Sequence, residues 1–287
     1  MVRDIADRIP NVEQIAVENI IDHLAQSSLQ DRGFVLLGSG GGGIGPAVAR
    51  AIAGAGGQVL CVDISGSEAS RVAESVGGVA MAADVRKRSD VEAVFEKAKQ
   101  IFGPRFHGVV DIVAVGMVAP IEACDDDALD WQIGIVFRHA LLALQYRTPL
   151  LAENGGGSFT FVGSRAGLRP IPNQAVYGSM KAALHHLVRT AAMELGPRNI
   201  RVNAVSPGFV MTTRLKQALS PEDWEKVAAT NPLRRMAEPD DIAKAILFMC
   251  SSLASYVTGN IMVLDGAGDN NVASLGLKLK LPEAAPQ

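Results

Sequence analysis

The chain has 287 residues, 48% of them hydrophobic, with 27 Lys and Arg against 30 Asp and Glu. Its net charge of −3 argues against a nucleic-acid groove, which carries a basic excess, and no apolar run is long enough to span a bilayer. Because Cys61, Cys124 and Cys250 follow no metal or redox spacing, we expect a cytoplasmic protein with reduced thiols, no metal, no secretory leader, no membrane contact and no nucleic-acid partner.

Two kinds of pattern alternate along the chain. Residues 1–32 carry apolar residues at helical spacing, which predicts an N-terminal helical extension. Short apolar runs follow and are typical of strands buried on both faces: 34–38, 58–63, 77–84, 108–116, 157–163, 200–206 and 260–266. Helical spacing lies between them, at 44–57, 88–102, 126–152, 175–195 and 239–252. The pattern predicts a single α/β domain over 33–270, a doubly wound sheet of about seven parallel strands with helices on both faces, followed by a tail over 271–287.

The stretch GSGGGGIGPAVA, residues 38–49, follows the first predicted strand and opens a helix. Glycines allow a turn with positive φ and a close approach of a pyrophosphate, and the helix start offers unpaired N–H groups. An acid about twenty residues later completes a dinucleotide cradle, and Asp63 stands there. The predicted cradle consists of Ser39, Gly40, Gly43, Ile44 and Gly45. Because Asp63 would repel a ribose phosphate and no Lys or Arg lies between 39 and 45 or 61 and 70, we expect NAD rather than NADP.

The stretch YGSMK places Tyr177 and Lys181 four residues apart, on one face of a predicted helix. A cation about 5 Å from a phenol, at an effective dielectric of about 20, favours the phenolate by roughly 3 kcal/mol, or about two pKa units. Such a phenol could exchange a proton with an alcohol or a ketone near neutral pH. The motif alone is common, so its context decides.

That context resembles the short-chain dehydrogenase/reductase family over about residues 33–270. A serine, Ser164, ends the strand that precedes YGSMK, and further matches are ADV at 83–85, SPG at 206–208, NPLRRMAEPDD at 231–241 and YVTGNIMVLDG at 256–266. The resemblance implies a Rossmann-type fold and an NAD-dependent alcohol dehydrogenase or ketoreductase. It also implies that Tyr177 is the general acid/base, that Lys181 lowers its pKa and holds the nicotinamide ribose, and that Ser164 binds the substrate oxygen.

The resemblance assigns further cofactor contacts by position. Asp84 and Val85 would contact the adenine. The nicotinamide end would lie against residues from two loops: Gly116, Pro207, Gly208, Val210 and Thr212.

Three departures from the family pattern stand out. Gly38 and Ser39 replace the usual Thr-Gly, and VAVG at 113–116 replaces the usual Asn-Asn-Ala-Gly. The family's catalytic Asn, which holds a water in a proton relay, aligns with Val136 or with Arg138, depending on the direction of counting. Either His139 or a backbone-held water replaces it, or the relay is impaired.

Substrate recognition in this fold belongs to loops beyond the carboxyl ends of the strands. The candidates are Arg165, Phe209, Met211 and Leu215, with residues 214–230 as a helical lid. Arg165 and Arg214 could meet an anionic group or could be solvated charges. We expect an apolar, cyclic secondary alcohol or ketone (steroid-like, terpenoid or aromatic) and a homo-oligomer, a tetramer or a dimer. The alternatives are an NAD-binding protein without turnover, a sensor or partner subunit, and a C=C reductase or an epimerase.

Overall fold

The computed structural model describes residues 25–268, which form one seven-stranded sheet. The strand order is β3-β2-β1-β4-β5-β6-β7, and every pairing is parallel. The strands are β1 (Gly33–Leu37), β2 (Gln58–Asp63), β3 (Val79–Ala82), β4 (Phe106–Asp111), β5 (Gly157–Val162), β6 (Ile200–Pro207) and β7 (Ile261–Leu264). The predicted doubly wound parallel sheet is confirmed.

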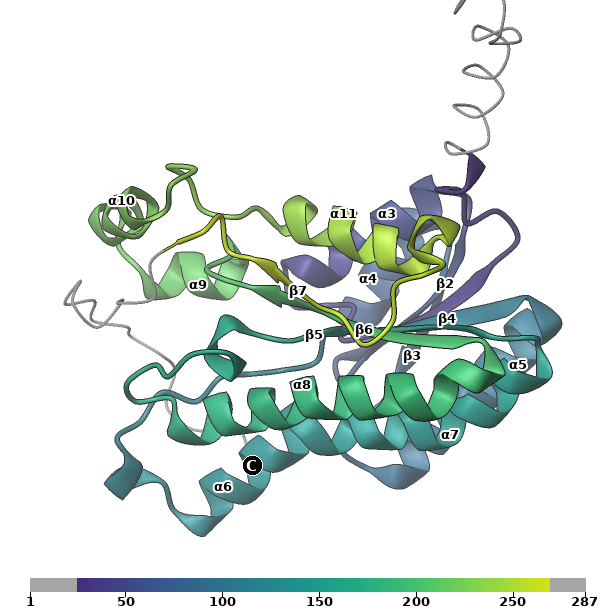
Figure 1. The fold of residues 1–287 in the computed structure, drawn as a ribbon, viewed down its shortest axis with the longest axis horizontal. Helices are drawn as coiled ribbons and strands as arrows, with labels where there is room; N and C mark the ends of the chain where they lie inside the picture. The colour runs from purple at the N-terminus through teal and green to yellow at the C-terminus, as the bar shows by residue number, and fades with distance from the viewer. Residues whose placement is uncertain (1–24, 269–287) are drawn as a thin grey trace, which may run out of the picture.

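Helices cover both faces of this sheet (Figure 1). One layer contains α3 (Ile44–Gly54), α4 (Gly66–Val76) and α11 (Pro239–Cys250). The opposite layer contains α5 (Arg88–Phe102), α7 (His139–Glu153) and α8 (Ala175–Leu195). Three shorter helices gather at one end of the molecule: α6 (Asp126–Ile133), α9 (Thr213–Ala218) and α10 (Pro221–Thr230).

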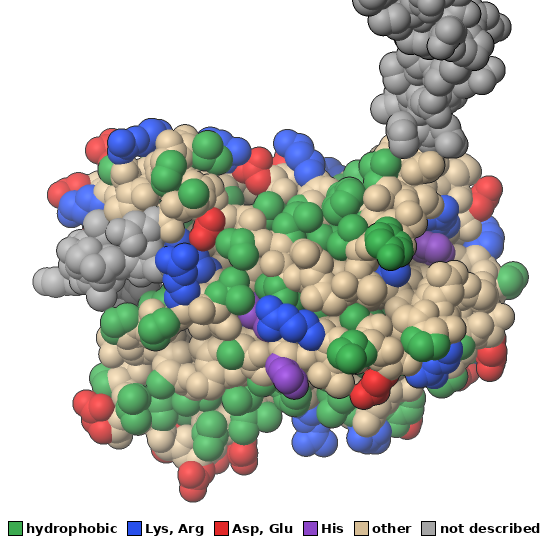
Figure 2. Space-filling view, viewed as in Figure 1, with side chains coloured by type: hydrophobic (Ala, Val, Ile, Leu, Met, Phe, Trp, Pro, Cys, Tyr) green, Lys and Arg blue, Asp and Glu red, His purple; other side chains and the backbone are tan. Residues whose placement is uncertain are grey.

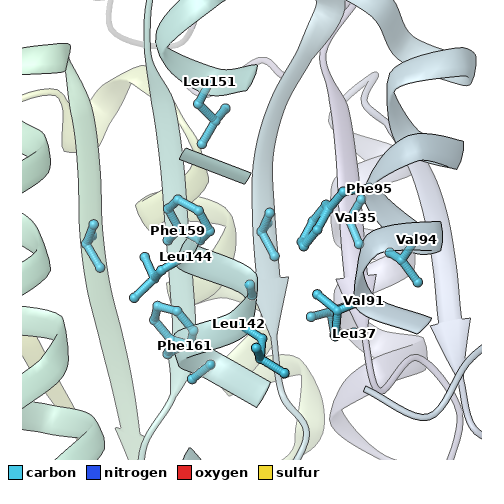
Figure 3. Close-up of a cluster of buried hydrophobic side chains, with 14 of the residues drawn as sticks. Val35, Leu37, Val91, Val94, Phe95, Leu142, Leu144, Leu151, Phe159 and Phe161 are labelled. Carbon is cyan, nitrogen blue, oxygen red and sulfur yellow. The ribbon is translucent and has the colours of Figure 1, made fainter. Parts of the chain in front are cut away.

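The hydrophobic core has two parts, one on each face of the sheet. Figure 3 shows the part beneath α5 and α7, where Phe95 and Val94 face Val35, and Leu144 lies against Phe159. The second part contains side chains of α3 and α11, which pack against each other over the other face. Burial of both faces explains why the strands are continuous apolar runs rather than alternating ones.

The chain reverses its direction of winding between β1 and β4, which are neighbours in the sheet. Leu37 pairs with Asp111, and Asp111 pairs with Phe161, so β1, β4 and β5 end at the same level. The loops that leave these three strands therefore meet at one edge. In doubly wound folds, ligands bind at this switch point.

One predicted boundary was wrong, and two predicted helical segments contain irregularities. The strand expected at 108–116 ends at Asp111, and residues 112–120 run as an irregular loop. The helix expected at 126–152 is present, and it continues from α6 through a wide π turn, Gly134–Arg138, into α7. The lid expected at 214–230 is two short helices, because Ser220 caps α10 and Pro221 opens it.

The last residues of the predicted N-terminal extension pack against the domain. Leu29 is buried, its amide donates to the Ala55 carbonyl at 2.8 Å, and Arg32 accepts from the Gln58 amide at 2.8 Å. Packing of the domain thus begins before residue 33. Residues 1–24, which hold most of the predicted extension, and the tail at 271–287 lie outside the described residues.

Acidic and basic side chains are interspersed over the face shown in Figure 2, without a large basic patch. Among residues 25–268 no helix has the length and hydropathy that crossing a membrane requires.

Candidate active site

A cavity of about 670 Å³ opens at the edge where β1, β4 and β5 end. Ser164, Tyr177 and Lys181 all line it. The sequence separates them by as many as 17 positions, and they come from the loop after β5 and the first turns of α8. The structure therefore brings together the three residues expected to carry the chemistry.

Ser164 and Tyr177 interact directly. The Ser164 backbone is extended just after β5, and its hydroxyl accepts a hydrogen bond from the Ala166 amide at 3.1 Å. Burial raises the pKa of Tyr177 above its usual value, although a hydrogen bond from Ser164 and the positive charge of Arg214 act in the opposite direction. The lowered pKa that the sequence predicted for Tyr177 beside Lys181 is therefore not seen in the structure. The phenol thus has one hydroxyl as a hydrogen-bond partner, and the charge of one cation acts on it.

Lys181 lies one turn further along α8 and is 1% exposed. Its Nζ donates to the Val162 carbonyl at 2.7 Å and lies 5.8 Å from the centroid of the Tyr177 ring. Burial lowers the pKa of Lys181 to about 8, although the Asp111 carboxylate acts in the opposite direction. Lys181 therefore remains mostly protonated at neutral pH, close to the phenol.

Asp111 and His139 form a buried acid–imidazole pair on the side of the sheet that also carries Lys181. The Asp111 Oδ2 and His139 Nδ1 atoms are 2.8 Å apart, and the two side chains are 1% and 2% exposed. The other imidazole nitrogen of His139 lies 3.1 Å from the Ile135 carbonyl, one turn back in the π turn. Val136 is buried and Arg138 is exposed, so neither position predicted for the missing Asn offers a polar group to the cavity.

The glycine-rich loop has the geometry of a nucleotide cradle. Gly41 and Gly42 have φ values of +72° and +64°, which side chains other than glycine rarely adopt. A Cβ on Gly45 would lie 2.3 Å from the Ser39 carbonyl oxygen, so α3 can approach the loop only with glycine there. The Ser39 hydroxyl is buried without a hydrogen-bond partner among the described residues, and Gly43 caps α3 without a side-chain bond. These groups fit a dinucleotide cofactor.

Asp63 stands at the end of β2 as predicted. Its Oδ2 accepts from the Gly40 amide at 2.9 Å and its Oδ1 from the Ser65 amide at 3.0 Å. The carboxylate is thereby held against the glycine loop. Arg71, one residue beyond the segment 61–70 that lacks basic residues, shares a depression with Gly42 and Gly43. It forms an ion pair with Glu68 at 2.7 Å.

Asp84 and Val85, the residues predicted to contact the adenine, lie outside the cavity. Two nitrogens of Arg86 donate to the Asp84 carboxylate, each at 2.8 Å, and hold the pKa of Asp84 below its usual range. Val85 is 6% exposed. Little of either side chain is open to a ligand.

The remaining predicted residues divide between two places. Most line the cavity: Ile44, Gly116, Pro207, Gly208, Val210, Thr212, Arg165, Phe209 and Leu215. Met211 does not, and instead lines the depression beside Gly42 and Gly43. The structure therefore does not place Met211 with the other expected substrate contacts.

Sequence reasoning missed two features, one in the cavity lining and one buried outside it. Asn173 and Gln174, in the turn before α8, line it close to Tyr177 in the chain. Asp111 was treated as part of a buried strand, yet it is the only acid in that apolar run. A buried acid needs a partner, so this lone carboxylate was a signal that a basic group, here His139, lies nearby.

Comparisons with known proteins find relatives over most of the chain. A family model described as enoyl-(acyl carrier protein) reductase matches residues 40–267. The 7alpha-hydroxysteroid dehydrogenase of Escherichia coli K12 is 34% identical over 236 residues, which cover 79% of this chain and 91% of that protein.

Solved structures show the same fold. A 7alpha-hydroxysteroid dehydrogenase complexed with NADH and 7-oxo glycochenodeoxycholic acid superposes with a TM-score of 0.81 at 32% identity, covering 85% of this chain and 96% of that one. A 3-ketoacyl-(acyl-carrier-protein) reductase from Brucella melitensis complexed with NADH gives 0.78 at 31% identity, covering 84% and 99%. The fold, the matched residues and these likenesses together make the chain an oxidoreductase of the short-chain dehydrogenase/reductase family.

Proposed function

We propose that the protein interconverts a secondary alcohol and a ketone with NAD(H). The observation that carries this proposal is the convergence of Ser164, Tyr177 and Lys181 on one cavity at the switch point of the sheet. When bound, the nicotinamide cofactor supplies or accepts the hydride. The residues of the chain then have to bind the substrate oxygen and move one proton.

Tyr177 is the proposed general acid in reduction and the general base in oxidation. Ser164 donates a hydrogen bond to the substrate oxygen, where negative charge develops as the hydride moves. Lys181 stabilises the phenolate by its charge, since its Nζ lies 5.8 Å from the ring centroid. It also holds the nicotinamide ribose.

The glycine loop supports the binding of a nicotinamide dinucleotide, as do the two similar structures described with NADH. The proposed contacts are Ser39, Gly40, Gly43, Ile44 and Gly45 for the phosphates and adenosine, and Gly116, Pro207, Gly208, Val210 and Thr212 for the nicotinamide. The preference for NAD over NADP rests on the carboxylate of Asp63, which is held at the loop. Cytoplasmic location is also part of the proposal, and the free, buried thiols of Cys61 and Cys250 are compatible with it.

An apolar, cyclic substrate is supported by the cavity wall, which includes Ile171, Phe209 and Leu215. A similar structure is described with a 7-oxo bile-acid ligand, a cyclic ketone. We therefore propose a steroid-like or comparably bulky ring ketone rather than a small open-chain one.

A panel of cyclic ketones assayed by NADH oxidation tests the proposal. We expect turnover with NADH, less with NADPH, and a decrease of kcat by about 10²- to 10⁴-fold in Tyr177→Phe with NADH binding retained. If Tyr177→Phe reacts like the wild type, or if the wild type binds NADH and oxidises none with any ketone, the proposal is wrong.

A C=C reductase is the second candidate, favoured by the match to a family model described as enoyl-(acyl carrier protein) reductase. An enone separates the two activities. Deuterated NADH would deliver deuterium to the carbonyl carbon of an alcohol product in the proposed reaction, and to the β-carbon of a saturated ketone in the alternative.

A further inference from the structure

Apart from Tyr177, every ionisable side chain that lines the cavity is basic. Arg165, Lys181 and Arg214 line it, and no Asp or Glu does. The chain as a whole has a net charge of −3, and acidic side chains are common on the surface in Figure 2. The cavity is therefore more positive than the molecule around it.

Two of these three cations have partners in the protein. Arg165 donates to the Gly268 carbonyl at 3.1 Å and lies 3.8 Å from the Asp265 carboxylate. Lys181 donates to the Val162 carbonyl at 2.7 Å. The guanidinium of Arg214 forms no hydrogen bond and no ion pair with another residue of 25–268.

Arg214 is also partly withdrawn from water. It follows the Thr212 cap of α9 and is intermediate in exposure, and burial lowers the pKa of its guanidinium. A half-buried cation without an anion is unfavourable in the free protein, because its lost hydration is not replaced. A bound carboxylate would replace the lost hydration, because it accepts two charge-assisted hydrogen bonds from the guanidinium.

We propose that Arg214 binds a carboxylate of the substrate, so that the enzyme selects ring ketones and alcohols that carry an acidic group. This inference rests on the proposed function and specifies its substrate class. Phe209 and Leu215 line the same cavity and would contact the apolar body, while Ser164 and Tyr177 meet the reacting oxygen. The site thus fits an amphipathic substrate with an apolar ring system and one anionic end.

The phosphates of the dinucleotide are the competing anion. Thr213, next to Arg214, donates through its amide to the Gly42 carbonyl at 3.0 Å and so joins α9 to the glycine loop. The side chain of Arg214, however, lines the cavity of Tyr177, and its charge acts on that phenol. A test therefore has to follow the substrate and the dinucleotide separately.

The experiment compares a 7-oxo bile acid with its methyl ester, which has the same rings and no charge. The kcat/KM for each and the KM for NADH are measured for the wild type, for Arg214→Gln and for Arg214→Lys. Lys226→Gln is the matched control, because it removes an exposed cation from the neighbouring helix α10, outside the cavity.

We expect the wild type to prefer the acid over the ester by about tenfold or more. Arg214→Gln should lose most of that preference, which is read as the ratio of kcat/KM for acid and ester because the charge of Arg214 also acts on Tyr177. Arg214→Lys should keep part of the preference. The preference should decrease with added salt. Lys226→Gln should match the wild type with both compounds.

Two kinetic results would overturn the inference. An equal loss on acid and ester in Arg214→Gln would mean that Arg214 acts through Tyr177 or through folding, and a raised KM for NADH with an unchanged acid preference would assign it to the cofactor.

If neither ketone is reduced, the proposed function is wrong, and calorimetry with the same two compounds still decides the inference. The inference is supported if the wild type binds the acid more tightly than the ester and Arg214→Gln binds both equally. Equal binding of acid and ester, or no binding of either, contradicts it.

Discussion

At the scale of single residues, the environment of Lys181 differs most from the family pattern. The expected Asn is absent, and a buried pair, Asp111 and His139, lies where the Asp111 charge acts on Lys181. Asp111 also accepts from the Val113 amide at 3.0 Å, and His139 reaches the Ile135 carbonyl. The pair therefore joins the end of β4 to the start of α7.

This arrangement predicts a strong coupling between the two side chains. His139→Leu should destabilise the fold by about 3 kcal/mol, because it leaves the Asp111 carboxylate buried without its partner. The double variant Asp111→Leu with His139→Leu should lose less than the sum of the two single variants. Denaturant unfolding measures both.

Arg138→Gln, at the exposed neighbour of His139, is the control and should change stability by less than about 0.5 kcal/mol. If the loss of unfolding free energy in the double variant equals the sum of the two single losses, Asp111 and His139 do not stabilise each other.

At the scale of elements, the glycine loop and α3 act as one unit. Packing of α3 against the loop depends on Gly45, whose missing side chain leaves room for the Ser39 carbonyl. Gly54, at the end of the same helix, has no atom within 4 Å of where its Cβ would stand. A side chain would therefore clash at Gly45 and would have open space at Gly54, although both glycines belong to α3.

Substitution by alanine at these two sites should give opposite outcomes. Gly45→Ala forces the loop to move and should weaken NADH binding by about tenfold or more, since the N–H groups of the cradle lose their positions. Gly54→Ala should leave binding unchanged and be neutral or stabilising by up to about 1 kcal/mol. Calorimetric titration with NADH and thermal unfolding check both, and equal NADH affinities in the two variants would refute the cradle.

At the scale of the whole molecule, exposed apolar side chains indicate association. Tyr256 is fully exposed and Met193 is 82% exposed, while Val263 lies on β7, the strand at the edge of the sheet. Figure 2 shows apolar side chains on the surface over α11 and below α8. Exposed apolar groups and an unpaired edge strand are common features of subunit interfaces.

Light scattering should therefore give a mass that is a multiple of 30.2 kDa, a dimer or a tetramer. Val263→Lys, with a charge on the edge strand, and Met193→Lys, with a charge on α8, should each lower the assembly state if their face is an interface. A monomer at micromolar concentration, unchanged by either substitution, would contradict the prediction.

The sequence by itself determined the fold class and the family. Both depend on local signals that a chain displays in order: apolar runs, glycines before a helix, an acid after the second strand, and Tyr177 one turn before Lys181. Ser164 and Tyr177 were assigned to one site from motif order, and their backbone placement follows from the strand and the helix that carry them.

Only the tertiary structure decided which side chains have partners. The π turn before α7, the Asp111–His139 pair, the occupied carboxylate of Asp84 and the position of Met211 beside the glycine loop depend on contacts between distant segments. The unpaired state of Arg214 among the described residues is of the same kind. Charge, burial and hydrogen bonding act through space, and a linear pattern shows which groups a chain contains but not which of them meet.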